Sequence, residues 1–395
     1  MSTFFQRIIA PYSLEEFFEK FHEKDMLHIS RNDKNYYNNI LTSREISAFL
    51  DRQDIFYPSL RLVKEGKEIP SSQYTKNAVP IGHHKKDGII HTEKAFALFN
   101  QGSTLVIQAG QRYFDNVSKC CMNLSQKFNS PVQANLYITP NKSQGFNPHW
   151  DTHDVFVLQI SGTKTWNLYG FEKELPTKNQ SFISKGYDKK PLQTLQLTPG
   201  DFLYVPRGYV HDAMADDGIS AHITIGILSF TWTRFFSEVF PQLENFKEFR
   251  EAVPFWKDDL DEIIKQKTAA LKNVLGELDF SMGVERLNAQ YQKTQPQPVN
   301  NYFQSLLDIN EFSEQTVFAL NESVIYSTSK DNDHLRIRFF EKTISLPLSA
   351  ETLMNSIFKQ KQFTLAQLPQ TITTENKKNV LKLLLREGLV HIRTL

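Results

Sequence analysis

Cysteine is almost missing from this sequence of 395 residues, which contains only Cys120 and Cys121. Neighbouring cysteines seldom pair with each other, so no disulfide framework is indicated and a reducing compartment fits. Long apolar runs are missing too, and no segment approaches the ~20 residues that a membrane-spanning helix needs. The formal net charge is +1, which argues against a general attraction to nucleic acid or membrane surfaces. We therefore expect a soluble, cytoplasmic protein without a membrane partner.

Aromatic side chains, in contrast, are plentiful: they make up 12% of the residues and include 31 phenylalanines. The apolar share of 40% and the charged share of 23% are ordinary for a globular protein. The length allows two or three domains, with cores in which large planar side chains dominate.

Short strand patterns separated by turn residues fill much of the first 230 residues. Residues 161–163 (SGT) are typical of a tight turn, so we expect 155–160 and 164–169 to pair as a β-hairpin. Many short strands with turns between them predict a barrel or sandwich of the jelly-roll kind. The expected strands are 103–108, 132–138, 155–160, 164–169, 193–197, 202–205 and 222–227, and the expected helices are one that begins at Ser13, 41–50 and 114–128.

The segment between residues 64 and 93 is polar and contains His83, His84 and His91. We interpret it as a mobile surface loop in preference to a metal site, since a metal role needs a geometry that the sequence does not show.

The composition changes at Thr231. Apolar residues recur at helical spacing from Trp232 to Leu243 and again from Leu260 to Leu278. Such stripes must be buried, either against the chain's own barrel or against a partner subunit. Residues 294–298 (TQPQP) are typical of a linker.

Beyond this linker, a helix over 374–386 ends near Gly388 and leads into a terminal strand, which indicates a small winged-helix unit. This last stretch is mildly basic. We interpret the charges as a solvated helix face and do not expect direct nucleic-acid binding. The basic residues are Lys377, Lys378, Lys382, Arg386 and Arg393.

The strongest chemical signal is the stretch 147–151 (NPHWD) together with His211 in the later stretch 206–211 (PRGYVH). In an extended strand, residues two apart point to the same face, so His149 and Asp151 are expected to project together. Two imidazoles and one carboxylate on one side of a metal leave the opposite positions open, as in non-haem Fe(II) oxygenases. His-x-Asp alone is a weak pattern, and its neighbours give it weight.

A metal of this kind needs a co-substrate, and Lys164 follows Asp151 on the next expected strand. Its ammonium is suited to the distal carboxylate of a bidentate keto-acid. Asn135 and Tyr137 share a face of the preceding strand and are candidate hydrogen-bond donors to the same ligand. For a lone lysine on a strand, the alternative is an exposed edge charge.

Taken in order, several segments resemble the JmjC ribosomal oxygenases, and the similarity by motif covers residues 8 to 230. These segments are 135–140 (NLYITP), 143–146 (SQGF), 148–151 (PHWD), 154–159 (DVFVLQ), 162–166 (GTKTW), 200–208 (GDFLYVPRG) with His211, and 222–225 (HITI). The resemblance implies an α+β protein: a double-stranded β-helix (a jelly-roll or cupin JmjC barrel) over 1–230. A helical dimerisation region over 231–298 and a C-terminal winged-helix domain over 299–395 would follow.

The resemblance also implies a dioxygenase that uses Fe(II), 2-oxoglutarate and O2 to hydroxylate a His or Arg side chain of a ribosomal protein. In such an enzyme His149, Asp151 and His211 bind the iron and Lys164 binds the 2-oxoglutarate carboxylate. Some bacterial members have Arg at this lysine position. Asn135, Tyr137 and Thr224 fall where the family lines the co-substrate pocket. The segment 212–221, near the substrate mouth, is shortened, which leaves the identity of the substrate open.

Two alternatives stand beside this interpretation. The same chemistry can act on a different peptide, a methyl-lysine or a small molecule. A non-enzymatic cupin that binds a metal is the other, and Lys164 counts against it, because such a module needs no lysine positioned for a keto-acid.

Overall fold

The computed structural model describes residues 3–180, 182, 187–294, 302–321 and 324–393. The chain divides into two compact units, Met1–Ser229 and Phe230–Leu395. The boundary predicted between 298 and 299, with most of the predicted linker, lies outside the described residues.

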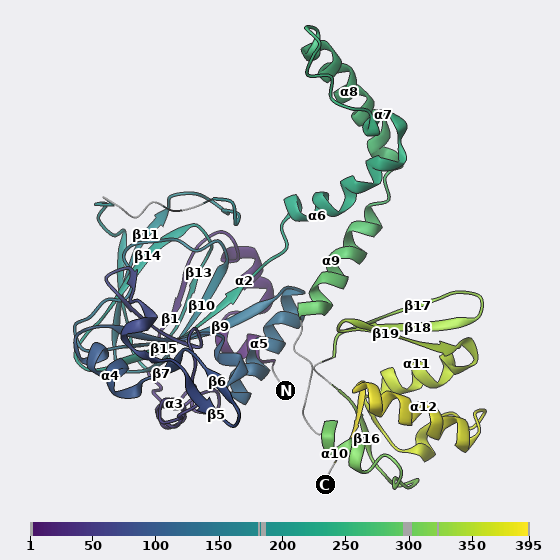
Figure 1. Ribbon diagram of the computed structural model, residues 1–395, viewed down its shortest axis with the longest axis horizontal. Helices are drawn as coiled ribbons and strands as arrows, with labels where there is room; N and C mark the ends of the chain where they lie inside the picture. The colour runs from purple at the N-terminus through teal and green to yellow at the C-terminus, as the bar shows by residue number, and fades with distance from the viewer. Residues whose placement is uncertain (1–2, 181, 183–186, 295–301, 322–323, 394–395) are drawn as a thin grey trace. The chain divides into compact units, whose positions relative to one another are not determined.

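Two antiparallel sheets form the first unit (Figure 1). The large sheet has eight strands in the order β1-β13-β10-β15-β9-β8-β2-β3, and the small sheet has three in the order β12-β11-β14. The strands are β1 Leu27–Ile29, β2 Leu60–Lys64, β3 Lys67–Glu68, β8 Thr104–Ile107, β9 Val132–Thr139, β10 Asp154–Ser161, β11 Lys164–Phe171, β12 Gln193–Leu197, β13 Phe202–Val205, β14 Tyr209–Ala215 and β15 Ser220–Ile227. From β10 to β15 the chain passes repeatedly between the two sheets, as in a jelly roll.

The predicted hairpin between β10 and β11 is wrong. Strand β10 pairs with β13 and β15 in the large sheet, whereas β11 pairs with β12 and β14 in the small one. Seven successive residues of β10 are buried, so this strand belongs in a sheet interior with neighbours on both edges. The turn at Gly162, which has φ +63°, therefore carries the chain from one sheet to the other.

Helices cover the large sheet with a core rich in phenylalanine. Phe5 lies 5.2 Å from Phe17 and 5.7 Å from Phe156 of β10, measured between ring centroids. The inner faces of the two sheets share a smaller apolar cluster that includes Val157, Trp166 and Leu203. The helices are α1 Phe4–Ile9, α2 Leu14–Lys20, α3 Ser43–Leu50, α4 Thr92–Asn100 and α5 Asp115–Phe128, and α2 is capped by Ser13 as predicted.

The segment 64–93 is more ordered than the predicted loop. It contains the short pairs β4 Thr75–Lys76 with β7 Ile89–Ile90, and β5 Val79–Ile81 with β6 His84–Lys86. Backbone pairing between nearby residues was not visible in the polar composition. His83 and His84 are exposed near the tip of the second pair.

The second unit begins with helices that leave apolar residues exposed. Val239 of α6 is buried against α9, where a Cβ on Gly283 would lie 2.6 Å from its side chain. Helix α9 lies within the region 231–298 that the resemblance implies to be helical, although no apolar stripe had been identified there. The elements are α6 Trp232–Val239, η3 Phe240–Asn245, α7 Lys247–Arg250, α8 Leu260–Val274, η4 Leu275–Glu277 and α9 Phe280–Thr294. The exposed apolar residues include Trp232, Phe236, Phe240, Phe255, Trp256, Ile264, Phe280 and Val284.

The C-terminal part of this unit has its own apolar core and two three-stranded sheets, β20-β16-β21 and β17-β18-β19. Its elements are α10 Tyr302–Leu307, β16 Phe318–Leu320, β17 Tyr326–Lys330, β18 His334–Phe339, β19 Lys342–Pro347, η5 Leu348–Ala350, α11 Glu351–Gln360, β20 Gln362–Phe363, η6 Leu365–Gln367, α12 Thr374–Glu387 and β21 Val390–Ile392. Across the described part of the chain, no helix combines the length and apolarity that a membrane crossing requires.

Candidate active site

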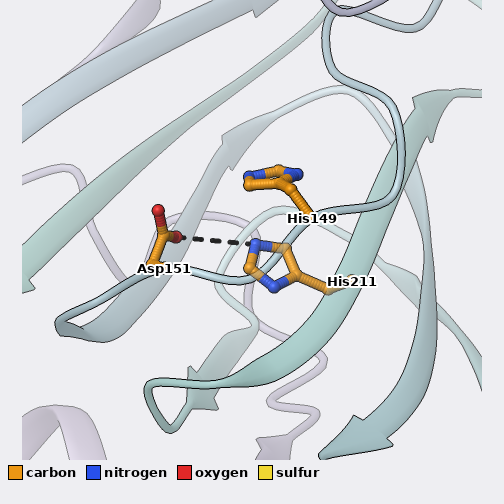
Figure 2. A group of neighbouring side chains, drawn as sticks. All are labelled: His149, Asp151 and His211. Atoms are coloured by element: carbon orange, nitrogen blue, oxygen red, sulfur yellow. Dashed lines mark ion pairs between the residues drawn. The ribbon is translucent and has the colours of Figure 1, made fainter. Parts of the chain in front are cut away.

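His149, Asp151 and His211 come together at the inner side of the small sheet (Figure 2). One ligand atom from each lies within 4.8 Å of the others, and Asp151 Oδ2 is 3.7 Å from His211 Nε2. His149 and Asp151 were expected on a strand, but they lie in the link that leads to β10. The backbone of His149 instead forms an isolated bridge with His211 of β14, through hydrogen bonds of 3.0 and 2.8 Å. This bridge holds the two imidazoles side by side.

Backbone carbonyls fix which nitrogen of each imidazole is free. His149 Nδ1 lies 2.8 Å from the carbonyl oxygen of Asn147, and His211 Nδ1 lies 3.0 Å from that of Tyr209. A carbonyl oxygen only accepts, so each Nδ1 atom carries a proton and Nε2 is the nitrogen of each ring that is left to bind a metal. Metal-binding histidines are oriented by this type of hydrogen bond.

The ionisation of the site also suits a cation. Burial lowers the pKa of His211 to about 4, with a further contribution from His149, so its ring is neutral at pH 7. Burial alone would raise the pKa of Asp151, but His153, His149 and His211 together bring it below its ordinary value. A carboxylate and the neutral imidazole of His211 are therefore present without the loss of further protons.

Lys164, at the start of β11, is buried and 4% exposed. Its Nζ donates to Thr139 Oγ1 at 3.1 Å, and within the described ranges no carboxylate forms an ion pair with it. Burial lowers its pKa to about 7. The alternative of an exposed edge charge is wrong, because β11 is the central strand of the small sheet and this side chain points inward.

All seven predicted site residues line one cavity of about 360 Å³ inside the first unit. Asn135 and Tyr137 lie on β9, and Thr224 is the partner of Asn135 on β15. Asn135 Oδ1 accepts from the backbone N–H of Ala109 at 3.0 Å, which leaves its amide nitrogen as a donor. Burial raises the pKa of Tyr137 to about 12, with Asp151 adding to the shift, so its hydroxyl keeps the proton.

Two further residues in or next to the cavity were not predicted. Thr139 holds Lys164, and His222 stacks on Tyr137 with ring centroids 5.1 Å apart. Burial, together with the charge of Lys164, keeps the pKa of His222 well below its usual range. Alternation along β9 was the available signal, because Gln133, Asn135, Tyr137 and Thr139 share one face. The remaining lining includes Arg61, Gln108, His153 and Trp166.

In a second group of metal-binding residue types, His22, Glu23 and Asp154, the two carboxylates accept hydrogen bonds from Arg207. Arg207 donates to Glu23 through its guanidinium and to Asp154 through its backbone N–H. Asp154 also accepts from the Tyr204 hydroxyl at 3.0 Å. These residues join the segment after α2 to the barrel.

We compared the sequence and the fold with those of known proteins. Residues 108–235 match the family model described as JmjC domain. The chain contains a JmjC domain. The predicted resemblance is thereby confirmed, and this JmjC domain includes all three candidate metal ligands, Lys164 and the cavity residues of β9 and β15.

Curated relatives match about three fifths of the chain. The bifunctional lysine-specific demethylase and histidyl-hydroxylase NO66 of Dictyostelium discoideum is 29% identical over 258 residues, covering 62% of this chain and 48% of that protein. Human ribosomal oxygenase 1 is 28% identical over 261 residues, covering 63% of this chain and 39% of its own length. The chain thus spans less than half the length of these relatives.

Among solved structures, the fold is similar to that of YcfD, a ribosomal oxygenase from Escherichia coli, in complex with cobalt and 2-oxoglutarate. The TM-score is 0.53 at 12% identity, and the match covers 97% of this chain and 99% of the other. At this identity the likeness shows the fold alone. It agrees with the predicted α+β class and a jelly-roll JmjC barrel.

Proposed function

We propose that this protein is an Fe(II)- and 2-oxoglutarate-dependent dioxygenase that hydroxylates a His or Arg side chain of a ribosomal protein in the cytoplasm. One observation carries the proposal: a two-histidine, one-carboxylate group shares one cavity with a buried lysine that pairs with no carboxylate among the described residues. A metal-binding cupin without enzymatic activity has no use for such a lysine.

His149, Asp151 and His211 fit a divalent metal of the iron type. Both Nε2 atoms are free to bind because both Nδ1 protons are donated to carbonyls. Three protein ligands on one side leave room for a bidentate keto-acid and O2. Bound Fe(II) supplies the oxidising chemistry, with O2 as the oxidant and 2-oxoglutarate as the source of electrons.

Lys164 binds the distal carboxylate of 2-oxoglutarate in this proposal, and Thr139 orients its ammonium. The anion restores the charge on a lysine whose pKa burial has lowered to about 7. The amide nitrogen of Asn135 and the hydroxyls of Tyr137 and Thr224 supply further hydrogen bonds along the same wall.

Within this proposal the cavity favours histidine over arginine. Among the described lining residues, carboxylates come from Asp151 and Asp212 alone. Asp151 belongs to the metal group, and Asp212 accepts hydrogen bonds from Asn167 and Tyr169. A guanidinium would enter without a counter-ion, which is costly, whereas a neutral imidazole needs none. NO66 is named both as a histidyl-hydroxylase and as a lysine-specific demethylase, so a methyl-lysine substrate is the second candidate.

We further propose that residues 231–298 form a homodimer interface and that 299–395 form a winged-helix domain. The exposed aromatic residues of α6 and of the segment before α8 support the first proposal, because they leave apolar surface for a second copy to cover. The succession α11, α12 and β21 around a small sheet supports the second.

The function is tested by measuring release of CO2 from 2-oxoglutarate by the purified protein with Fe(II) and total ribosomal proteins. We expect turnover that requires iron and is lost in His211→Ala. The matched control is His84→Ala, an exposed histidine outside the cavity, which keeps the parent rate. Equal turnover in the two variants would contradict the proposal.

A further inference from the structure

The cavity has two ends, and strand β9 runs from one to the other. Thr139, near Lys164, marks the end assigned to 2-oxoglutarate. Gln133 lies six residues earlier on the same inward face, which places it roughly 20 Å away at a rise of about 3.3 Å per residue. Gln133 lines the same cavity, together with His153, Gly226 and Leu228.

Hydrogen-bond polarity determines what Gln133 presents to this end of the cavity. The Ala109 backbone N–H only donates, so the Asn135 atom that it contacts must be the oxygen Oδ1. The Gln133 atom 3.1 Å from that oxygen must then be the amide nitrogen. The carbonyl oxygen of Gln133 therefore faces away from Asn135, and no group in the described part of the chain donates to it.

Gly226 of β15 lies beside Gln133 in the same sheet, as its cross-strand partner. A Cβ at Gly226 would lie 2.4 Å from His153 Cδ2 and 2.6 Å from His153 Nε2. The imidazole of His153 thus occupies the space that a side chain at 226 would need. As a result, this end of the cavity is lined by a planar ring next to an acceptor oxygen.

On the basis of the function proposed above, we propose that Gln133 is a specificity-determining substrate residue. Its Oε1 accepts a hydrogen bond from an N–H of the side chain to be hydroxylated, while His153 forms the wall against which that side chain lies. The preferred ligand at this end is a neutral planar group with one N–H to donate, an imidazole. Asn135 Oδ1 accepts from both the Ala109 N–H and the Gln133 amide nitrogen. This shared acceptor keeps the Gln133 oxygen oriented toward the substrate.

Binding of two small probes tests this role without relying on turnover. The protein is loaded with Mn(II) and 2-oxoglutarate, and the NMR line broadening of N-acetylhistidine methylamide and N-acetylarginine methylamide is measured. We expect the histidine probe to bind more tightly to the parent protein. Gln133→Met keeps the length but removes the acceptor, and it should weaken this binding about tenfold, because the N–H then loses its partner. The affinity for 2-oxoglutarate should not change.

Gln133→Glu provides the second variant, since a carboxylate there supplies the counter-ion that a guanidinium lacks, and preference should move toward the arginine probe. Gln193→Met, an exposed glutamine of β12, is the matched control and should bind both probes as the parent does. Unchanged histidine-probe affinity in Gln133→Met, or no probe binding by a parent protein that binds 2-oxoglutarate, would overturn the role of Gln133. Failure of the Mn(II)-loaded parent to bind 2-oxoglutarate would instead overturn the proposed function.

Discussion

Lys164 Nζ donates a hydrogen bond of 3.1 Å to Thr139 Oγ1 inside the barrel, where both side chains are buried. The threonine oxygen orients the ammonium but does not neutralise it. Burial consequently lowers the pKa of Lys164 to about 7 in the protein without ligand. The affinity of the cavity for a dicarboxylate must then depend on pH.

The sign of this dependence follows from proton linkage. A bound carboxylate raises the pKa of Lys164, so above pH 7 binding of 2-oxoglutarate takes up a proton, and below pH 7 Lys164 already holds it. From pH 7 to 9 the Kd should therefore rise by up to about tenfold per pH unit. Isothermal titration with the Mn(II) protein, in buffers of different ionisation enthalpy, measures both Kd and proton uptake.

Variants at Lys164 supply the controls. Lys164→Arg keeps its charge throughout this range, so its Kd should be independent of pH. Lys164→Ala should weaken 2-oxoglutarate binding by ~2–5 kcal/mol, because one partner of a buried charge pair is removed. A parent Kd that stays constant between pH 7 and 9 would remove Lys164 from the binding site.

Asp151→Ala should abolish metal binding and 2-oxoglutarate turnover while the fold persists. The barrel has a large apolar core of its own, and loss of metal from an open catalytic site need not unfold such a domain. Mass spectrometry measures the metal content, and circular dichroism shows whether the fold persists. Asp217→Ala, at an exposed carboxylate, is the control and should keep its metal. Normal metal content in Asp151→Ala would show that the ion binds elsewhere.

Gly162→Ala should destabilise the first unit more than Gly218→Ala. Both glycines have positive φ, +63° and +92°, so alanine is strained at each by about 1–2 kcal/mol. Only the Cβ at 162 would also meet the backbone, 2.1 Å from the carbonyl oxygen of Ile219, whereas nothing lies within 4 Å at 218. Backbone displacement should bring the loss for Gly162→Ala to about 3 kcal/mol. Urea unfolding measures the free energy of unfolding of each variant. Equal losses in the two variants would mean that the turn at residue 162 can shift to accommodate the Cβ.

The double variant Trp232→Glu with Phe236→Glu should convert a dimer into monomers in analytical ultracentrifugation. Trp232 is 74% exposed on α6, and burial of such rings between two copies is worth about 25 cal/mol per Å² of apolar surface. Thr233→Glu places one such charge on the same helix outside the aromatic stripe and should leave the dimer intact. A parent protein that sediments as a monomer at micromolar concentration would end the dimer proposal.

The sequence allowed the site to be predicted better than the pairing of its strands. His149, Asp151 and His211 were recognised from residue type and spacing, although the reason given for their alignment was wrong. A backbone bridge between His149 and His211 aligns them, and no local pattern reveals pairing across 62 residues. Strand β14 was missed because its residues, YVHDAMA, do not alternate regularly between apolar and polar.

Gln133 and His153 show a different limit. Alternation along β9 was sufficient to place Gln133 beside Asn135, but its role depends on which amide atom faces the cavity. That orientation follows from the Ala109 N–H, which lies on a different segment of the chain. The position of His153 over Gly226 likewise depends on strand register. Local sequence patterns do not reveal how strands that are distant in the sequence align with one another.

Mass spectrometry of ribosomal proteins tests the central proposal most directly. Ribosomes are isolated from cells that produce the parent chain and from cells that produce Asp151→Ala at the same level. We predict one histidine in one ribosomal protein that carries an added oxygen in the first sample and lacks it in the second. Ribosomal proteins of identical mass in both samples, with the parent chain folded and loaded with iron, would contradict the proposed function.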